Sequence, residues 1–152
     1  MTTSGTSTYD PENYRLRTFY DASAEFRDGR DTPRAYLERC LETIEAKEPV
    51  VRAWVVLNTE NARIAADESS ARYKAGRPLS AIDGMPIGIK DVIQTKDMPT
   101  ALGSAIYEGR QTHLYSPSFD ALRLSCAILF LQTLSTSFAF IVPLPTSHPF
   151  DP

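Results

Sequence analysis

The sequence predicts an α/β fold that contains some parallel strand pairing. Three observations support this prediction: helical apolar periodicities alternate with short apolar runs, a run around Trp54 is rich in β-branched residues, and glycine and proline separate the segments. The 152 residues suffice for one compact domain and are too few for two full ones. With 42% hydrophobic and 23% charged residues, the composition is that of an ordinary globular protein.

The first predicted helix runs from about Tyr14 to Arg27. It follows residues 1–13, whose polar composition predicts a disordered N-terminal tail. Gly29 ends the helix, because glycine is favoured just past a helix C-terminus. The residues that recur at helical spacing are Leu16, Phe19, Tyr20 and Ala24.

A second helix is predicted to begin after Asp31 or Thr32, either of which can cap it. Pro33 suits the first turn of this helix, and Pro49 is expected to close the segment. The residues that share one face of the helix are Leu37, Cys40, Leu41 and Ile44.

The run from Val50 to Leu57 predicts a strand, because it is β-branched and apolar with little polar alternation. Such a run is typical of a strand buried on both faces of a sheet. Asn58 or Thr59 then caps a helix from about Glu60 to Ala75. Its small-residue face, which indicates close packing, consists of Ala62, Ala65, Ala66, Ser69 and Tyr73.

The chain from Arg77 to Gly103 is rich in glycine, proline and aspartate, and is predicted to form site-building loops. A further helix is expected from Phe119 to about Ile128, followed by the apolar run 129–131. The uncharged stretch from Leu124 to Val142 also raises the alternative of a membrane segment. A buried helix followed by a strand explains the stretch more simply, because polar residues lie at its centre: Gln132, Thr133, Ser135, Thr136 and Ser137.

Several function classes are disfavoured by composition and spacing. The formal charge of −3 and the absence of a Lys/Arg cluster argue against nucleic acid as a partner. Cys40 and Cys126 are far apart and are predicted to be reduced, buried thiols, while His113 and His148 lack partners at metal-binding spacing. We therefore expect no metal or other cofactor. The start of the sequence lacks a secretory pattern, which predicts a cytoplasmic protein.

Lys90 is the residue that suggests chemistry, because it ends an apolar run within the segment 82–91. Burial can depress a lysine pKa by about 3–5 units, which would give a neutral amine able to accept a proton from a serine hydroxyl. The alternative is that Lys90 extends into solvent at a strand end and pairs with Asp91 or another carboxylate. Gly88, two residues earlier, leaves room for another backbone or a ligand.

A sequence resemblance favours the chemical interpretation of Lys90. The pattern Gly84-x-Pro86-x-x-x-Lys90-Asp91, preceded by Leu79 and followed by the stretch 100–104, resembles the lysine-bearing segment of the amidase signature family. The similarity extends upstream through Thr32-Pro33, Leu37, Leu41 and Ile44. It implies that residues 14–152 are the incomplete N-terminal portion of an amidase-like domain, with helices packed on a partial mixed sheet.

The resemblance also implies a reaction, the hydrolysis of a carboxamide to a carboxylate and ammonia. In that family a serine nucleophile is deprotonated through a second serine, on a cis peptide, to a neutral lysine, and water then hydrolyses the acyl-enzyme. By matching position, Lys90 is that lysine. Asp91, its neighbour in an extended strand, should point to the opposite face.

The sequence departs from the family pattern at several positions after residue 110. Glycines are expected at Cys126, Leu131 and Leu144, a lysine at Gln132, and an aspartate near Tyr115. The glycine- and serine-rich stretch that carries the nucleophile is expected beyond residue 152. Ser69 and Ser70 lie in a predicted helix and Ser104 in a loop. We therefore expect this chain to be inactive, or nearly so, on its own.

Three functional hypotheses follow from the sequence. The first is a truncated amidase whose full-length relative acts on a small-molecule amide, and one type of subunit in the tRNA-dependent amidotransferases shares the same resemblance. The second is a non-catalytic interaction module or pseudoenzyme derived from an amidase, because an incomplete sheet exposes edges that can pair with a partner. The third is the membrane segment, which is disfavoured. The sequence fixes neither the substrate nor the oligomeric state.

Overall fold

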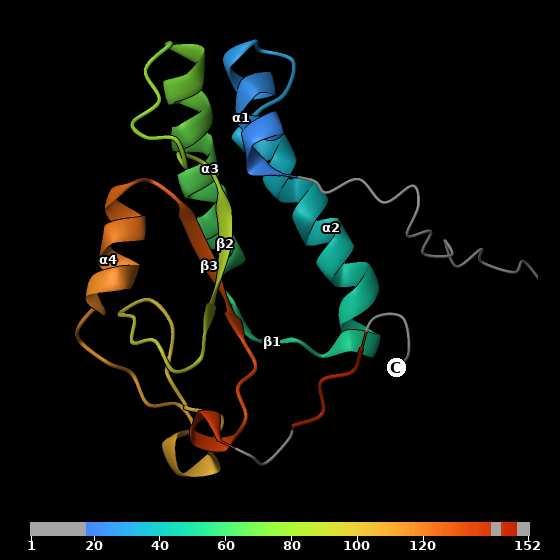
Figure 1. Ribbon diagram of the computed structural model, residues 1–152, viewed down its shortest axis with the longest axis vertical. Coiled ribbons are helices and arrows are strands. Elements are labelled where there is room, and N and C mark those ends of the chain that lie inside the picture. The colour runs from blue at the N-terminus through green and yellow to red at the C-terminus, as the bar shows by residue number, and fades with distance from the viewer. Residues whose placement is uncertain (1–17, 141–143, 149–152) are drawn as a thin grey trace, which may run out of the picture.

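The computed structural model describes residues 18–140 and 144–148, so the predicted tail at residues 1–13 lies outside the described chain. The structure confirms the predicted mixture of helices and strands (Figure 1). The helices are α1 (Phe19–Arg27), α2 (Pro33–Val51), α3 (Thr59–Lys74) and α4 (Pro117–Leu124). The strands are β1 (Trp54–Leu57), β2 (Pro86–Lys90) and β3 (Ile128–Thr133), and two short 3-10 helices are η1 (Ala105–Tyr107) and η2 (Ser137–Ala139).

Helix α2 begins where the sequence predicts and ends later. The Thr32 hydroxyl accepts a hydrogen bond from the backbone N–H of Ala35 at 3.1 Å, so Thr32 is the cap. The predicted end at Pro49 is wrong, because the helix continues to Val51. The Glu48 carboxylate stabilises this last turn by accepting the backbone N–H groups of residues 53 and 54 at 3.2 and 2.9 Å.

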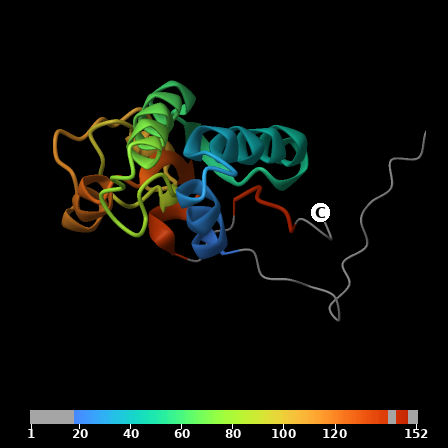
Figure 2. The same ribbon diagram turned by 90° about the horizontal axis from the view of Figure 1, so that it is seen from above.

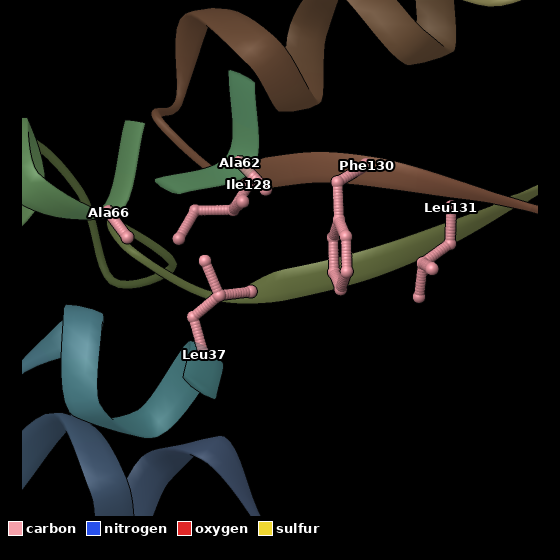
Figure 3. Packing of buried hydrophobic residues seen from close by; sticks show 6 residues of the cluster. All are labelled: Leu37, Ala62, Ala66, Ile128, Phe130 and Leu131. Carbon is pink, nitrogen blue, oxygen red and sulfur yellow. The ribbon is translucent and has the colours of Figure 1, made fainter. Parts of the chain in front are cut away.

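The three strands form a mixed sheet in the order β1-β3-β2. β3 pairs antiparallel with β1 and parallel with β2. The register between β2 and β3 shifts after the pair Ile87–Leu129, so that Gly88 lies opposite Leu131. This bulge makes the successive side chains of Phe130 and Leu131 point the same way from β3 (Figure 3).

Strand β1 lies at an edge of the sheet, and the prediction that it is buried on both faces is wrong. Val55 and Leu57 are each 42% exposed. The strand also begins at Trp54 rather than at Val50. An edge strand can keep one face open to solvent even when its composition is apolar, which is why the sequence pattern misleads here.

Helices cover both faces of the sheet (Figure 2). α2 and α3 contribute Leu37, Ala62 and Ala66 to a core that they share with Ile128 and Phe130 of β3 (Figure 3). The opposite face carries a second core, formed by Ile89 of β2, Phe119 of α4 and Met98 of the loop after β2. α1 packs on α3 through an edge-to-face contact of the Phe26 and Tyr73 rings, whose centroids are 5.3 Å apart.

The apolar stretch that begins at Leu124 is divided between the end of α4, a turn and strand β3, and residues 141–143 lie outside the described chain. Among the described helices, none combines the length and apolar character needed to cross a bilayer. In the turn, Cys126 has a φ of 60°. The sequence pattern expects a glycine at this position, and the left-handed backbone is the physical reason for that expectation.

Candidate functional site

Lys90 is the last residue of β2 and lies opposite Thr133 of β3. Its side chain is exposed, and within residues 18–140 and 144–148 no hydrogen bond or ion pair engages its ammonium group. The desolvation that the sequence interpretation requires is therefore not found in the described chain.

Asp91 follows Lys90 and is 1% exposed, so the two side chains lie on opposite faces as predicted. The Asp91 carboxylate accepts the backbone N–H groups of Ala101 and Gly103 at 2.8 and 3.0 Å. Its backbone carbonyl accepts the N–H of Leu102 at 3.0 Å. The exposed position of Lys90 at the end of β2 agrees with the alternative interpretation, whereas among the described residues no ion pair joins Lys90 to Asp91.

The turn that binds Asp91 also contacts the chain after β3. Leu102 and Gly103 both have a left-handed backbone, with φ of 55° and 63°. A Cβ atom at Gly103 would lie 2.2 Å from the carbonyl oxygen of Ser135, so only glycine fits without movement of the backbone. The Phe138 N–H donates to the Leu102 carbonyl at 2.8 Å. The turn thus joins the end of β2 to the segment that follows β3.

Asp83 anchors the loop before β2 to α3. It is 0% exposed and accepts hydrogen bonds from Arg72 Nη2 and Ser69 Oγ, both at 2.7 Å, and from the Leu79 N–H at 2.9 Å. Burial by itself raises the pKa of the Asp83 carboxyl, but these donors outweigh burial and hold that pKa below its usual value. Asp83 is therefore a fully paired structural carboxylate.

A groove of about 700 Å³ lies on the face of the sheet to which Gly88 points, and α1 and α2 border it. The ring of Trp54 fills the space beside Gly88, because a Cβ atom at Gly88 would lie 2.9 Å from it. The room that the sequence predicts at Gly88 therefore holds a side chain of this protein. Cys40 also lines the groove, and burial raises the pKa of its thiol, which makes it a poor nucleophile.

The serines considered from the sequence have structural roles. Ser69 donates to Asp83, and the Ser70 hydroxyl donates to the carbonyl of Ala66 at 2.7 Å. The Ser104 hydroxyl accepts the N–H of Ile106 at 3.4 Å at the start of η1. In the part of the chain that the structure describes, no three His, Cys, Asp or Glu side chains lie close enough together to hold a metal ion.

Comparison with known proteins identifies the family. The family model described as Amidase matches residues 35–150, which include β2 and Lys90. The chain belongs to the amidase signature family. Sequence relatives of this amidase-family chain include a glutamyl-tRNA(Gln) amidotransferase subunit from Chloroflexus aggregans, 49% identical over 84 residues. The subunit of the same name from Chloroflexus aurantiacus is 32% identical over 140 residues.

The amidase-family chain spans only a part of these relatives. The C. aggregans match covers 55% of this chain and 16% of the relative, and the C. aurantiacus match covers 86% and 28%. A crystal structure of an amidase is 28% identical with a TM-score of 0.72, over 82% of this chain and 28% of that one. The peptide amidase from Stenotrophomonas maltophilia, 24% identical over 84% of this chain and 26% of its own, shares the fold with a TM-score of 0.75.

Sequence reasoning missed the environments of two buried polar residues near the end of β2, Asp91 and Gln132. It treated Asp91 only as a neighbour of the lysine, because the backbone groups that bind its carboxylate lie 10 and 12 residues further along the chain. It named Gln132 as a polar residue within an apolar stretch and as a departure from the family lysine, and predicted no partner or burial for it. The Gln132 amide is 0% exposed and, among the described residues, has no hydrogen-bond partner. No local signal in the sequence predicts either environment.

Proposed function

We propose that this chain supplies the general base, Lys90, for hydrolysis of a carboxamide to a carboxylate and ammonia. The observation that supports the proposal is the position of Lys90 in an amidase-family chain, at the carboxyl end of β2 with its ammonium free of any described carboxylate. A lysine that is to lose its proton must not be held in its charged form by an ion pair. Asp91 is engaged by the backbone on the other face and so does not hold it.

In the proposed reaction, a serine hydroxyl attacks the amide carbonyl while its proton passes through a second serine to the Lys90 amine. The proton then moves to the leaving nitrogen, ammonia departs, and water hydrolyses the acyl-enzyme ester. Lys90 must be desolvated for this role, whereas it is exposed in the described chain. We therefore infer that the segment that covers Lys90 and carries the two serines lies outside the described residues.

The first test compares the purified 152-residue chain with its Lys90→Ala variant in ammonia release from simple aliphatic and aromatic carboxamides. Circular dichroism first checks that both chains are folded. We expect no turnover by either, because the described serines considered above are engaged in structural hydrogen bonds. Turnover that depends on Lys90 would mean that a nucleophile is present in this chain, and would contradict the expectation that the chain is inactive on its own.

The second test examines the base directly in a chimera. The segment that matches the 28% identical amidase replaces the equivalent segment of that enzyme, with Lys90 intact or changed to alanine or arginine. We expect Lys90→Ala to reduce kcat by about 1,000-fold or more, as removal of a catalytic base commonly does. Lys90→Arg keeps the charge but cannot deprotonate, and should lose as much. An active Lys90→Arg chimera would contradict the proposal.

A second candidate function is binding to another protein without catalysis. The exposed Val55 and Leu57 of edge strand β1 favour it, because an apolar edge strand pairs readily with a further strand. The relatives named as amidotransferase subunits suggest a larger assembly as well. Sedimentation velocity, read together with the ammonia assay, distinguishes the binding role from the catalytic role. A monodisperse chain without Lys90-dependent activity favours the binding role, and concentration-dependent aggregation contradicts it.

A further inference from the structure

We propose that Asp91 is a positioning residue for Lys90, and that its carboxylate acts as an internal anion bound by the backbone of the turn 101–103. The inference rests on the proposed function, because that function makes Lys90 the general base. Its structural basis is independent of catalysis, because it depends only on the hydrogen bonds of Asp91. According to this inference, Asp91 holds in place the end of β2, which carries Lys90.

The turn presents three successive N–H groups to this one residue. Those of Ala101 and Gly103 donate to the two carboxylate oxygens at 2.8 and 3.0 Å, and that of Leu102 donates to the Asp91 carbonyl at 3.0 Å. The N–H groups of Ala101 and Gly103 thus converge on one carboxylate, and backbone N–H groups that point to a common site favour an anion there. The left-handed backbone at Leu102 and Gly103 is what makes the groups converge.

The carboxylate is held without a cation. Asp91 is 1% exposed, and within the described ranges no Lys, Arg or His side chain forms an ion pair with it. A buried carboxylate needs donors to replace water, and here peptide N–H groups supply them. Asparagine has the same shape but only one acceptor oxygen, and its NH₂ group would face a backbone donor. The site therefore requires a carboxylate rather than a side chain of similar size.

The placement of Asp91 fixes Lys90 because Asp91 directly follows Lys90, the last residue of β2, and begins the turn after the strand. The Asp91 N–H donates to the Thr133 carbonyl at 3.2 Å, so β3 also holds this residue. With Asp91 fixed on one face, the Lys90 side chain must leave the opposite face. The carboxylate that is nearest in sequence is thereby removed from the ammonium group, to which it would otherwise be an available partner.

The first experiment measures amide hydrogen exchange in the 152-residue chain and its Asp91→Asn variant. We expect the amides of Ala101 and Gly103 to exchange about 10- to 100-fold faster in the variant, because hydrogen bonds to a charged acceptor are lost. Asp97→Asn is the matched control. It makes the same chemical change at an exposed carboxylate that accepts the Tyr115 hydroxyl, and it should leave both amides unchanged.

The second experiment removes the carboxylate with Asp91→Ala and adds formate, with chloride at equal ionic strength as the control. We expect formate, and not chloride, to restore protection of the Ala101 and Gly103 amides, because it can occupy the vacated concavity. The side-chain NMR signal of Lys90 should shift in Asp91→Ala and return with formate. The signals of Lys47 and Lys74, on α2 and α3, should stay in place, whereas a general loss of structure would move them too.

Several results would overturn the inference. One is wild-type exchange at Ala101 and Gly103 in Asp91→Asn, and another is a Lys90 signal that is unmoved in folded Asp91→Ala. If Asp91→Ala does not fold, the exchange rates of Asp91→Asn decide alone. Lys90→Ala should leave both amides protected. Failure of the proposed catalytic role would therefore appear only in the ammonia assay, and failure of this inference only in exchange and NMR.

Discussion

Two buried aspartates flank strand β2, and the protein balances their charges differently. Asp83, before the strand, is bound by the Arg72 guanidinium, the Ser69 hydroxyl and one backbone N–H. Among the described residues, only backbone N–H groups bind Asp91, which follows the strand. The first carboxylate joins β2 to a helix through an ion pair, whereas the second orders a turn without placing another cation near Lys90. The comparison indicates that the same residue type serves as a structural anchor at one end and as a support for a candidate site at the other.

The largest effect on stability is expected at Asp83. Asp83→Ala should lower the free energy of unfolding by about 3–5 kcal/mol, because it leaves the Arg72 guanidinium without its anion. Urea denaturation measures the loss. The control is Asp67→Ala, which removes the exposed partner of Arg34 and should cost much less, because solvent screens an exposed ion pair. Equal losses in the two variants would mean that the Asp83 ion pair is not a principal anchor.

The turn that binds Asp91 can be tested without changing the Asp91 carboxylate. Gly103→Ala should cost about 2–4 kcal/mol, because a Cβ atom there would lie 2.2 Å from the Ser135 carbonyl in a left-handed backbone. Gly29→Ala is the matched control, since Gly29 has a φ of +70° and nothing within 4 Å of the added atom. It should cost only about 1 kcal/mol. If both variants lose the same amount, the close contact at Gly103 contributes nothing beyond its backbone conformation.

A fall in pH should reduce the contribution of Asp83 to the free energy of unfolding. The donors around Asp83 hold its pKa below the usual value, so its contribution to stability is fully present above the unfolded-state pKa of about 4. The contribution is lost as the pH falls through the folded-state pKa. The stability difference between wild type and Asp83→Asn should therefore narrow as the pH falls from about 6 to about 3. Parallel urea midpoints across this range would assign the acid sensitivity to other carboxylates.

The smallest effect is expected at Cys126, next to the loop that holds Asp83, and it is a gain in stability rather than a loss. The Gly84 N–H donates to the Cys126 carbonyl at 2.9 Å, and Cys126 has a φ of 60°. Cys126→Gly should stabilise the protein by about 1 kcal/mol, because glycine adopts this backbone without strain. Cys40→Gly, within helix α2, should instead destabilise it by about 1 kcal/mol. A destabilised Cys126→Gly variant would show that packing of the thiol outweighs the backbone strain.

The sequence predicted elements best where the signal is local. The Thr32 cap, the first turn at Pro33 and the small-residue face of α3 are confirmed, because capping and helical periodicity act over three or four residues. The end of α2 at Pro49 and the double-sided burial of β1 were wrong. In both cases contacts that are not apparent from the sequence pattern decided the outcome: the Glu48 carboxylate closes the helix, and β1 occupies a sheet edge.

The candidate site was predictable only in part. The pattern around Lys90 placed the lysine at a strand end and Asp91 on the opposite face, because side chains alternate along a strand. The expected desolvation of Lys90 was not found, since burial depends on segments that pack over the strand rather than on the strand itself. The partners of Asp91 were not predicted, because every residue except proline has a backbone N–H group and the sequence does not show which of these groups face the carboxylate.

The sequence by itself determined the α/β class, the start of α2 and the position of Lys90 in a pattern of the amidase signature family. Only the tertiary structure decided which groups neutralise Asp83 and Asp91, which face of β1 stays open and that Lys90 is exposed. The physical reason is the range of the interactions. Periodicity and capping act between residues a few positions apart, whereas burial and charge compensation join groups that only the folded chain brings together.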